Sequence, residues 1–270
     1  MKSKINMFAA IALFSTALIF PEICLSEHKR GKANHEVIPF KIGATSVSAS
    51  LYIREKTGIV YFNMHDNENT CVEAAKSIVD AHGGYFIELK AQGKRLITFE
   101  LKGRKYIFDP NRIFTSKGTT KTLRKYGKYS KDAYDEIRSF VKTLSGYVFV
   151  DGCKVMVAVH NNTDKRYSLK GYMKGGSYAR DASRVYFNPN MDLDDFFFVT
   201  DDRYFNYFKK RELNVVLQNN KTVTDDGSLS VYCGRHGIPY INIEAQHGHL
   251  KEQLKMFRAI QGIPKLATSQ

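Results

Sequence analysis

The sequence predicts an α/β fold, and three features of the 270-residue chain support that prediction. Strand-like segments rich in β-branched and aromatic residues alternate with amphipathic segments of helical period. Several apolar strands end directly in polar residues, as expected in open α/β sheets, where functional groups collect at strand ends. A hydrophobic content of 43% is sufficient for one compact core in a chain of this size.

The N-terminus has the pattern of an export signal. Two lysines precede an almost wholly apolar run over residues 7–20, and Pro21 and small residues near Ser26 follow it. The apolar run is shorter than the roughly 20 residues that a membrane-spanning helix needs. We therefore expect a signal peptide over 1–26, a single mature domain over 27–270 with no transmembrane segment, and a periplasmic or secreted location.

The first predicted elements are strands followed by a helix. Residues 37–62 contain two apolar, β-branched runs, and the second run, 58–62, is typical of a buried strand. A polar loop follows, after which Thr70 and Glu73 have the spacing of a capping box and predict a helix that ends at Gly83. The expected apolar face of this helix comprises Val72, Ala75, Ile78 and Val79.

The middle of the chain predicts a hairpin and a second helix. Alternating apolar residues predict strands at 85–89, 95–101 and 105–108. Residues 102–104 form the expected hairpin turn. A helix is expected over 131–144, capped by Ser130 and closed by Gly146.

The last part of the chain returns to the alternating pattern. Apolar segments predict strands at 154–159, 196–199, 215–218 and 238–243, with a helix near 201–211. The first of these strands ends in His160, which a long loop with Gly171, Gly175 and Gly176 follows, and the last strand ends on Glu244. A closing amphipathic helix is expected from the spacing of Leu250, Leu254, Phe257 and Ile260.

Polar residues at three predicted strand ends have the composition of a catalytic zinc site. Such a site commonly uses two histidines and one carboxylate and leaves the fourth position for water. His65 and Glu68 are three residues apart, and His160 from another strand could complete the ligand set. A carboxylate outside the ligand set must then accept the proton of water, and Glu244 is the candidate general base.

Each of these residues also has a simpler interpretation. A single His-x-x-Glu is most often a pair of polar loop residues, and His160 could cap or hydrogen-bond a strand end. Glu244 could form a structural ion pair, and the nearby His247 and His249 are competing metal ligands.

The order of these residues resembles the zinc carboxypeptidase family. His-x-x-Glu at residues 65–68 is followed by Asp-Pro-Asn-Arg-Ile-Phe at 109–114, then by His160 and finally by Glu244. The second stretch is similar to the family's Asp-x-Asn-Arg-x-Phe segment. The resemblance covers nearly all of the mature chain, from about residue 60 to residue 260.

The resemblance implies roles for these residues and a fold. His65, Glu68 and His160 would bind Zn²⁺, Asn111 and Arg112 would bind a substrate carboxylate, and Glu244 would be the general base. A guanidinium is also chemically suited to bidentate carboxylate binding. The implied fold is a mixed sheet of about eight strands between layers of helices. Candidates for the family's additional arginine are Arg95 and Arg104, and Tyr232 is a candidate for its active-site tyrosine.

The expected function is therefore hydrolysis of an amide bond near a free carboxylate, by an exported zinc enzyme. A cell-wall stem peptide, derived from peptidoglycan, is the substrate that the expected location favours. A deacylase of N-acyl amino acids needs the same metal, base and arginine, so this alternative stays open.

Charge and cysteine content add two further alternatives. The net charge of +14 predicts attraction to anionic surfaces, and the basic run 117–131 is either a solvated face or a polyanion-binding patch of a non-catalytic protein. No motif indicates specific nucleic-acid binding. Of the three cysteines of the expected mature chain, at most two can pair with each other, and Cys233 near His236 is a weaker candidate nucleophile.

Overall fold

The computed structural model of the chain describes residues 33–163 and 167–263. The expected signal peptide at 1–26 lies outside the described residues, so its prediction stays untested. Among the described helices, none is long and apolar enough to cross a membrane.

A mixed sheet of nine strands runs through the described part of the chain, in the order β1-β2-β4-β3-β7-β11-β9-β10-β8. The strands β4, β3, β7 and β11 are parallel neighbours, and antiparallel strands flank them on both sides. In this order the strands span Asn34–Ile42, Thr45–Arg54, Gly84–Lys90, Ile59–Asn63, Val155–Asn162, Tyr240–Gln246, Phe196–Val199, Val215–Gln218 and Ala182–Tyr186. A separate hairpin pairs β5 (Ile97–Leu101) with β6 (Arg104–Phe108).

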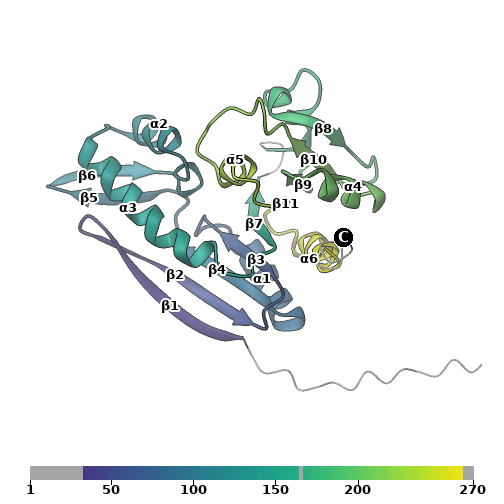
Figure 1. The fold of residues 1–270 in the computed structure, drawn as a ribbon, viewed down its shortest axis with the longest axis horizontal. Helices are drawn as coiled ribbons and strands as arrows, with labels where there is room; N and C mark the ends of the chain where they lie inside the picture. The colour runs from purple at the N-terminus through teal and green to yellow at the C-terminus, as the bar shows by residue number, and fades with distance from the viewer. Residues whose placement is uncertain (1–32, 164–166, 264–270) are drawn as a thin grey trace, which may run out of the picture. The chain divides into compact units, whose positions relative to one another are not determined.

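Helices cover both faces of the large sheet (Figure 1). On one face pack α1 (Asn69–His82), α4 (Asp202–Lys210) and α6 (Leu250–Ile260). On the other face pack α2 (Ser116–Tyr126), α3 (Lys131–Val148) and α5 (Leu229–Arg235). Short 3₁₀ helices span Pro110–Arg112, Leu169–Tyr172 and Ala179–Asp181. The mixed α/β sandwich is therefore confirmed, with nine strands instead of about eight.

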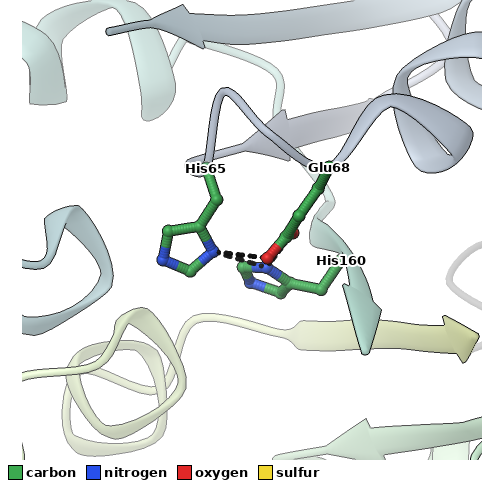
Figure 2. Close-up of side chains that lie close together, drawn as sticks. All are labelled: His65, Glu68 and His160. Carbon is green, nitrogen blue, oxygen red and sulfur yellow. Dashed lines mark hydrogen bonds and ion pairs between the residues drawn. The ribbon is translucent and has the colours of Figure 1, made fainter. Parts of the chain in front are cut away.

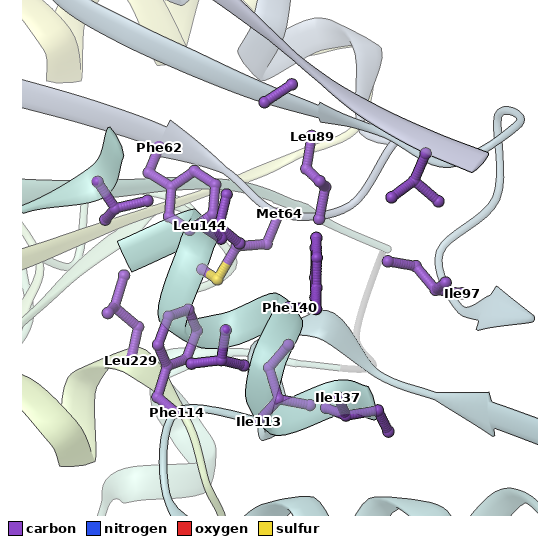
Figure 3. Close-up of a cluster of buried hydrophobic side chains, with 14 of the residues drawn as sticks. Phe62, Met64, Leu89, Ile97, Ile113, Phe114, Ile137, Phe140, Leu144 and Leu229 are labelled. Atoms are coloured by element: carbon purple, nitrogen blue, oxygen red, sulfur yellow. The ribbon is translucent and has the colours of Figure 1, made fainter. Parts of the chain in front are cut away.

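Alternation along the strands decides which face each side chain reaches. In β7, Val155, Val157 and Val159 pack with the α1 layer, whereas Met156 and Ala158 pack with the α3 layer. The next residue on the α3 side is His160. The apolar cluster on this side includes Phe62, Met64, Leu89, Phe140 and Leu144 (Figure 3). This buried cluster supports the sheet from which the polar site residues extend.

The start of α1 differs from the expected capping box. The helix begins at Asn69, Glu68 occupies the N-cap position without a side-chain cap bond, and the Thr70 hydroxyl instead accepts a hydrogen bond from the Gly248 backbone at 2.9 Å. The capping box is therefore wrong, because Thr70 lies inside the first turn and its hydroxyl is engaged by Gly248 instead of capping the helix. The expected helix end is confirmed, since Gly83 is the C-cap with a φ of 78°.

Two predictions about helix ends have opposite outcomes in α3. The Ser130 side chain caps the helix by accepting a hydrogen bond from the Ala133 backbone, as predicted. Gly146 does not end the helix, which continues to Val148. The space beside Gly146 is open, since no atom outside the helix backbone lies within 4 Å of a Cβ built there. No neighbouring segment therefore contacts this position and interrupts the helix.

Several elements extend beyond or between those expected. The run 37–54 forms a hairpin of two antiparallel strands. Its turn requires glycine at position 43, because the φ there is 57° and a Cβ would lie 2.2 Å from the Glu100 carbonyl oxygen. Strands β7 and β11 continue past His160 and Glu244 instead of ending on them. Helices α2 and α5 and strand β8 were not expected, because their segments are short or rich in Gly, Ser and Thr.

Candidate metal centre

Three polar side chains converge at the carboxyl end of the parallel strands (Figure 2). His65 follows β3, Glu68 precedes the first turn of α1, and His160 lies near the end of β7. One ligand atom from each lies within 4.8 Å of the others, and all three side chains are buried. The structure thus brings together the three residues predicted as metal ligands.

The distances within this group show which atoms face one another. The Nδ1 atoms of His65 and His160 are 3.2 Å apart. Glu68 Oε1 lies 2.9 Å from His65 Nδ1, and Glu68 Oε2 lies 2.9 Å from His160 Nδ1. Atoms bound tetrahedrally to zinc at about 2.0–2.1 Å lie roughly 3.3 Å apart, so the arrangement is close to that of a ligand set.

Asp109 orients the first of the two histidines. Its Oδ1 lies 2.9 Å from His65 Nε2 and also accepts a hydrogen bond from the Asn111 backbone at 2.8 Å. The Thr122 hydroxyl accepts a hydrogen bond from the Asp109 backbone at 2.9 Å, which holds this segment against α2. A carboxylate at Nε2 favours the tautomer with its proton there, so that the Nδ1 lone pair faces Glu68 and His160.

The electrostatics of the group favour a bound cation. Burial would raise the pKa of Glu68, but the two histidines hold it far below its usual value. Burial likewise opposes protonation of His65, yet Glu68 and Asp109 raise its pKa above the usual value. Two buried carboxylates around two imidazoles therefore stabilise positive charge at this point, and the donors present fit a divalent metal ion.

Backbone and amide contacts fix the segments that carry these ligands. The Asn161 backbone donates to Glu68 Oε2 at 3.2 Å. From α6, the Gln253 amide donates to the His160 carbonyl at 3.1 Å and accepts from the Asn161 side chain at 2.7 Å. Gln253 is fully buried. Helix α6 therefore holds the end of β7 from the sheet face opposite to the one from which the His160 side chain extends.

Glu244 lies beside the ligand group but outside it. In the parallel β7–β11 pairing its Cα partner is His160, and paired residues of neighbouring strands extend from the same sheet face. The Asn242 amide donates to Glu244 Oε1 at 2.9 Å. Burial raises the pKa of Glu244, which makes this carboxylate more basic than an exposed glutamate.

Arg95 contacts the centre, although no sequence motif distinguished it from Arg104. Its Nη1 lies 2.5 Å from Glu68 Oε1, and 47% of its side chain is exposed. The loop that carries Arg95 is tied to the ligand segment by Asp66, whose Oδ2 accepts from the Ala91 backbone at 2.7 Å and the Gly93 backbone at 2.6 Å. Arg104 is an exposed residue of the β6 hairpin strand.

Asn111 and Arg112 lie in the 3₁₀ turn that follows Asp109. The Asn111 side-chain oxygen accepts from the Leu229 backbone at 3.0 Å, which orients the amide and leaves its NH₂ group without a partner among the described residues. The Arg112 Nε lies 3.4 Å from Asp226 Oδ2, and its Nη1 donates to the Asn111 carbonyl at 2.7 Å. Both side chains are partly exposed, so a ligand can reach them.

The other candidates lie outside the ligand group. His247 and His249 are in the turn after β11, and His249 Nδ1 is 4.0 Å from Asp195. Tyr232 stacks on His236 in α5, with ring centroids 4.1 Å apart. Burial raises the pKa of the Cys233 thiol, which disfavours the thiolate that a nucleophile needs. Cys71, Cys153 and Cys233 are all free thiols.

No protein-family model and no curated protein matches this chain. Among solved structures, a succinylglutamate desuccinylase from Vibrio parahaemolyticus is similar with a TM-score of 0.45 and 12% identity, over 87% of this chain and 69% of that one. A succinylglutamate desuccinylase/aspartoacylase from Rhodobacter sphaeroides gives 0.44 and 10%, over 90% and 68%. Thrombin-activatable fibrinolysis inhibitor gives 0.46 and 8%, over 87% and 71%. These similarities are distant.

Proposed function

We propose that this protein is a zinc-dependent hydrolase that cleaves an amide bond near a free carboxylate. The observation that carries this proposal is the buried group of His65, Glu68 and His160, with Asp109 on the outer nitrogen of His65. Two imidazole nitrogens 3.2 Å apart that face the same carboxylate group have the spacing of ligands to one ion. A ligand set explains this arrangement.

The residues around the centre have distinct roles in this proposal. Zinc in a site of two histidines and one carboxylate activates water near neutral pH and polarises a carbonyl group. Glu244 accepts the proton of the attacking water and delivers it to the leaving amine. Arg95 is partly exposed beside Glu68, from where its guanidinium stabilises negative charge that develops on the carbonyl oxygen.

The substrate carboxylate would bind at the turn after Asp109. The NH₂ group of Asn111, which has no partner in the described ranges 33–163 and 167–263, and the guanidinium of Arg112 are donors suited to a carboxylate. Asp226 is 42% exposed and can release Arg112 to a ligand at small cost, because exposed ion pairs are weak. A cell-wall stem peptide and an N-acyl amino acid both carry the required carboxylate, and export to the periplasm or outside would favour the peptide.

Metal analysis of matched variants tests the proposal. We expect about one zinc per purified chain, lost in His65→Ala and retained in His247→Ala, because only His65 belongs to the ligand group. A chain that binds no zinc even after incubation with the metal would exclude the mechanism. The basic run 117–131 would then become the main functional feature, and reversal of its charges, rather than Glu244→Gln, would abolish function.

A further inference from the structure

An aromatic cluster covers the sheet face on the far side of Glu244 from His160. The Cα partner of Glu244 in β9 is Phe196, which therefore extends from the same face. The ring centroid of Tyr167 lies 5.5 Å from that of Phe196, and the ring centroid of Tyr172 lies 6.1 Å from it. Glu244 is thus flanked by a metal ligand on one side and by tyrosines on the other.

The hydroxyl groups of Tyr167 and Tyr172 form a hydrogen bond with each other. In such a pair one phenol donates to the other, and the proton of the acceptor phenol remains free to donate. No other described residue accepts a hydrogen bond from either hydroxyl. Burial raises the pKa of both phenols, so both remain protonated at neutral pH. The pair therefore presents one donor that lacks an acceptor within the described protein.

The hydroxyl pair lies on the Glu244 side of the proposed site, because both rings pack on Phe196, the strand partner of Glu244. The charge of Glu244 raises the pKa of both phenols, and the charge of Arg112 lowers that of Tyr167. A substrate with its carboxylate at Arg112 and its scissile amide near Glu244 would therefore pass the tyrosines. The part of the substrate between these two groups is the residue that carries the free carboxylate.

A glycine-rich loop builds the outer part of this cluster. The ring of Tyr178 packs on Tyr172 at 5.4 Å and on Tyr167 at 5.9 Å between centroids, and 42% of Tyr178 is exposed. A Cβ on Gly171 would lie 2.9 Å from the Tyr178 ring, and a Cβ on Gly176 would lie 2.3 Å from the Gly171 carbonyl oxygen. The glycines therefore allow a close-packed loop that holds the tyrosines in place.

We propose that Tyr167 and Tyr172 form a specificity-determining wall of the substrate pocket. Their surplus hydroxyl proton selects a substrate whose carboxylate-bearing residue has a hydrogen-bond acceptor, a carboxylate or amide, in its side chain. An aliphatic side chain of the same size would leave this donor unpaired when the pocket excludes water. This inference rests on the proposed function, because it concerns the same site.

Binding of two ligands of matched shape tests the inference without requiring turnover. The probes are N-acetylglutamine, which has a side-chain amide, and N-acetylmethionine, which lacks one, titrated calorimetrically into the zinc-loaded full chain. We expect about tenfold tighter binding of the glutamine derivative. This preference should fall to less than about twofold in the double variant Tyr167→Phe/Tyr172→Phe, with unchanged zinc content, because either hydroxyl alone would still be a donor. Tyr129→Phe, at an exposed position between α2 and α3, should keep the preference.

Three outcomes separate this inference from the proposed function. If both ligands weaken equally in the Phe variants, or if the preference survives, the hydroxyl pair is only structural and the inference is overturned. If hydrolysis is found, the variants should raise KM for acceptor-bearing substrates and leave kcat nearly unchanged; a loss in kcat alone would contradict a binding role. If zinc-loaded protein shows the tyrosine-dependent preference without hydrolysis, the pocket is supported and the proposed reaction is refuted.

Discussion

Replacement of Asp109 by alanine should weaken metal binding without removing a ligand. Asp109 Oδ1 is 2.9 Å from His65 Nε2, and Asp109 is 5% exposed, so the interaction is shielded from water. Without the carboxylate, His65 can rotate or carry its proton on Nδ1, and both changes compete with ligation. Loss of such an outer partner typically lowers metal affinity about 10- to 100-fold, or about 1.4–2.7 kcal/mol.

Competition with a chromogenic chelator would measure this affinity in purified Asp109→Ala and in the parent chain. Asp132→Ala is a suitable control, because Asp132 is an exposed residue at the start of α3 and pairs with Lys102. The Asp109 backbone still donates to Thr122 in the variant, so the segment should stay folded. A zinc affinity within about threefold of the parent would refute the reasoning that Asp109 orients His65.

Three further predictions concern the base, the core and acid stability. Glu244→Gln should lower kcat/KM about 10²- to 10⁴-fold and leave the zinc content unchanged. Steady-state kinetics and metal analysis of the purified variant would measure both quantities. A fully active variant would exclude Glu244 as the general base. Phe140→Ala should destabilise the fold by about 3–5 kcal/mol in urea titrations, because its buried ring packs on Phe40 at 5.4 Å; a loss below about 1 kcal/mol would contradict the packing argument. Burial opposes ionisation of Asp225, but hydrogen bonds from Thr115 and Arg235 lower the pKa of this carboxyl group in the folded protein. The ionised Asp225 therefore stabilises the fold at pH values above the ordinary carboxyl pKa. This stabilisation is lost as the pH falls through the lower pKa of the folded state. Asp225→Asn should therefore unfold more easily than the parent at pH 6, with the difference shrinking towards about pH 2; an equal difference at both values would refute the linkage.

Local patterns in the sequence were sufficient to predict most of the secondary structure. The period of apolar residues located α1, α3, α4, α6 and the central strands, because one buried face imposes that period on each element. The segments that were missed, α2, α5 and β8, are short and contain residues of weak helix or strand preference. Their conformation depends on neighbours, as the Thr115 cap bonded to Asp225 illustrates at the start of α2.

The candidate ligands could be predicted for a related reason. His65 and Glu68 lie in the loop after the apolar strand β3, and His160 lies near the end of β7; the carboxyl ends of parallel strands meet at one edge of a sheet. Composition then restricts the chemistry, because two imidazoles and a carboxylate suit few ions other than zinc and similar metals. Local sequence patterns therefore suffice to identify the available side chains and the chemistry for which they are suited.

The other polar groups that contact these ligands are selected by the folding of distant segments onto one another. Asp109 contacts His65 although the two residues are 44 positions apart in the sequence. Arg95 contacts Glu68 from 27 positions away, because Asp66 fixes the loop that carries Arg95. The tyrosine pair lies beside Glu244 only because β9 pairs with β11 in one register. Such contacts depend on strand order and loop closure, which are set by the packing of the whole chain and leave no periodic signal in any one segment.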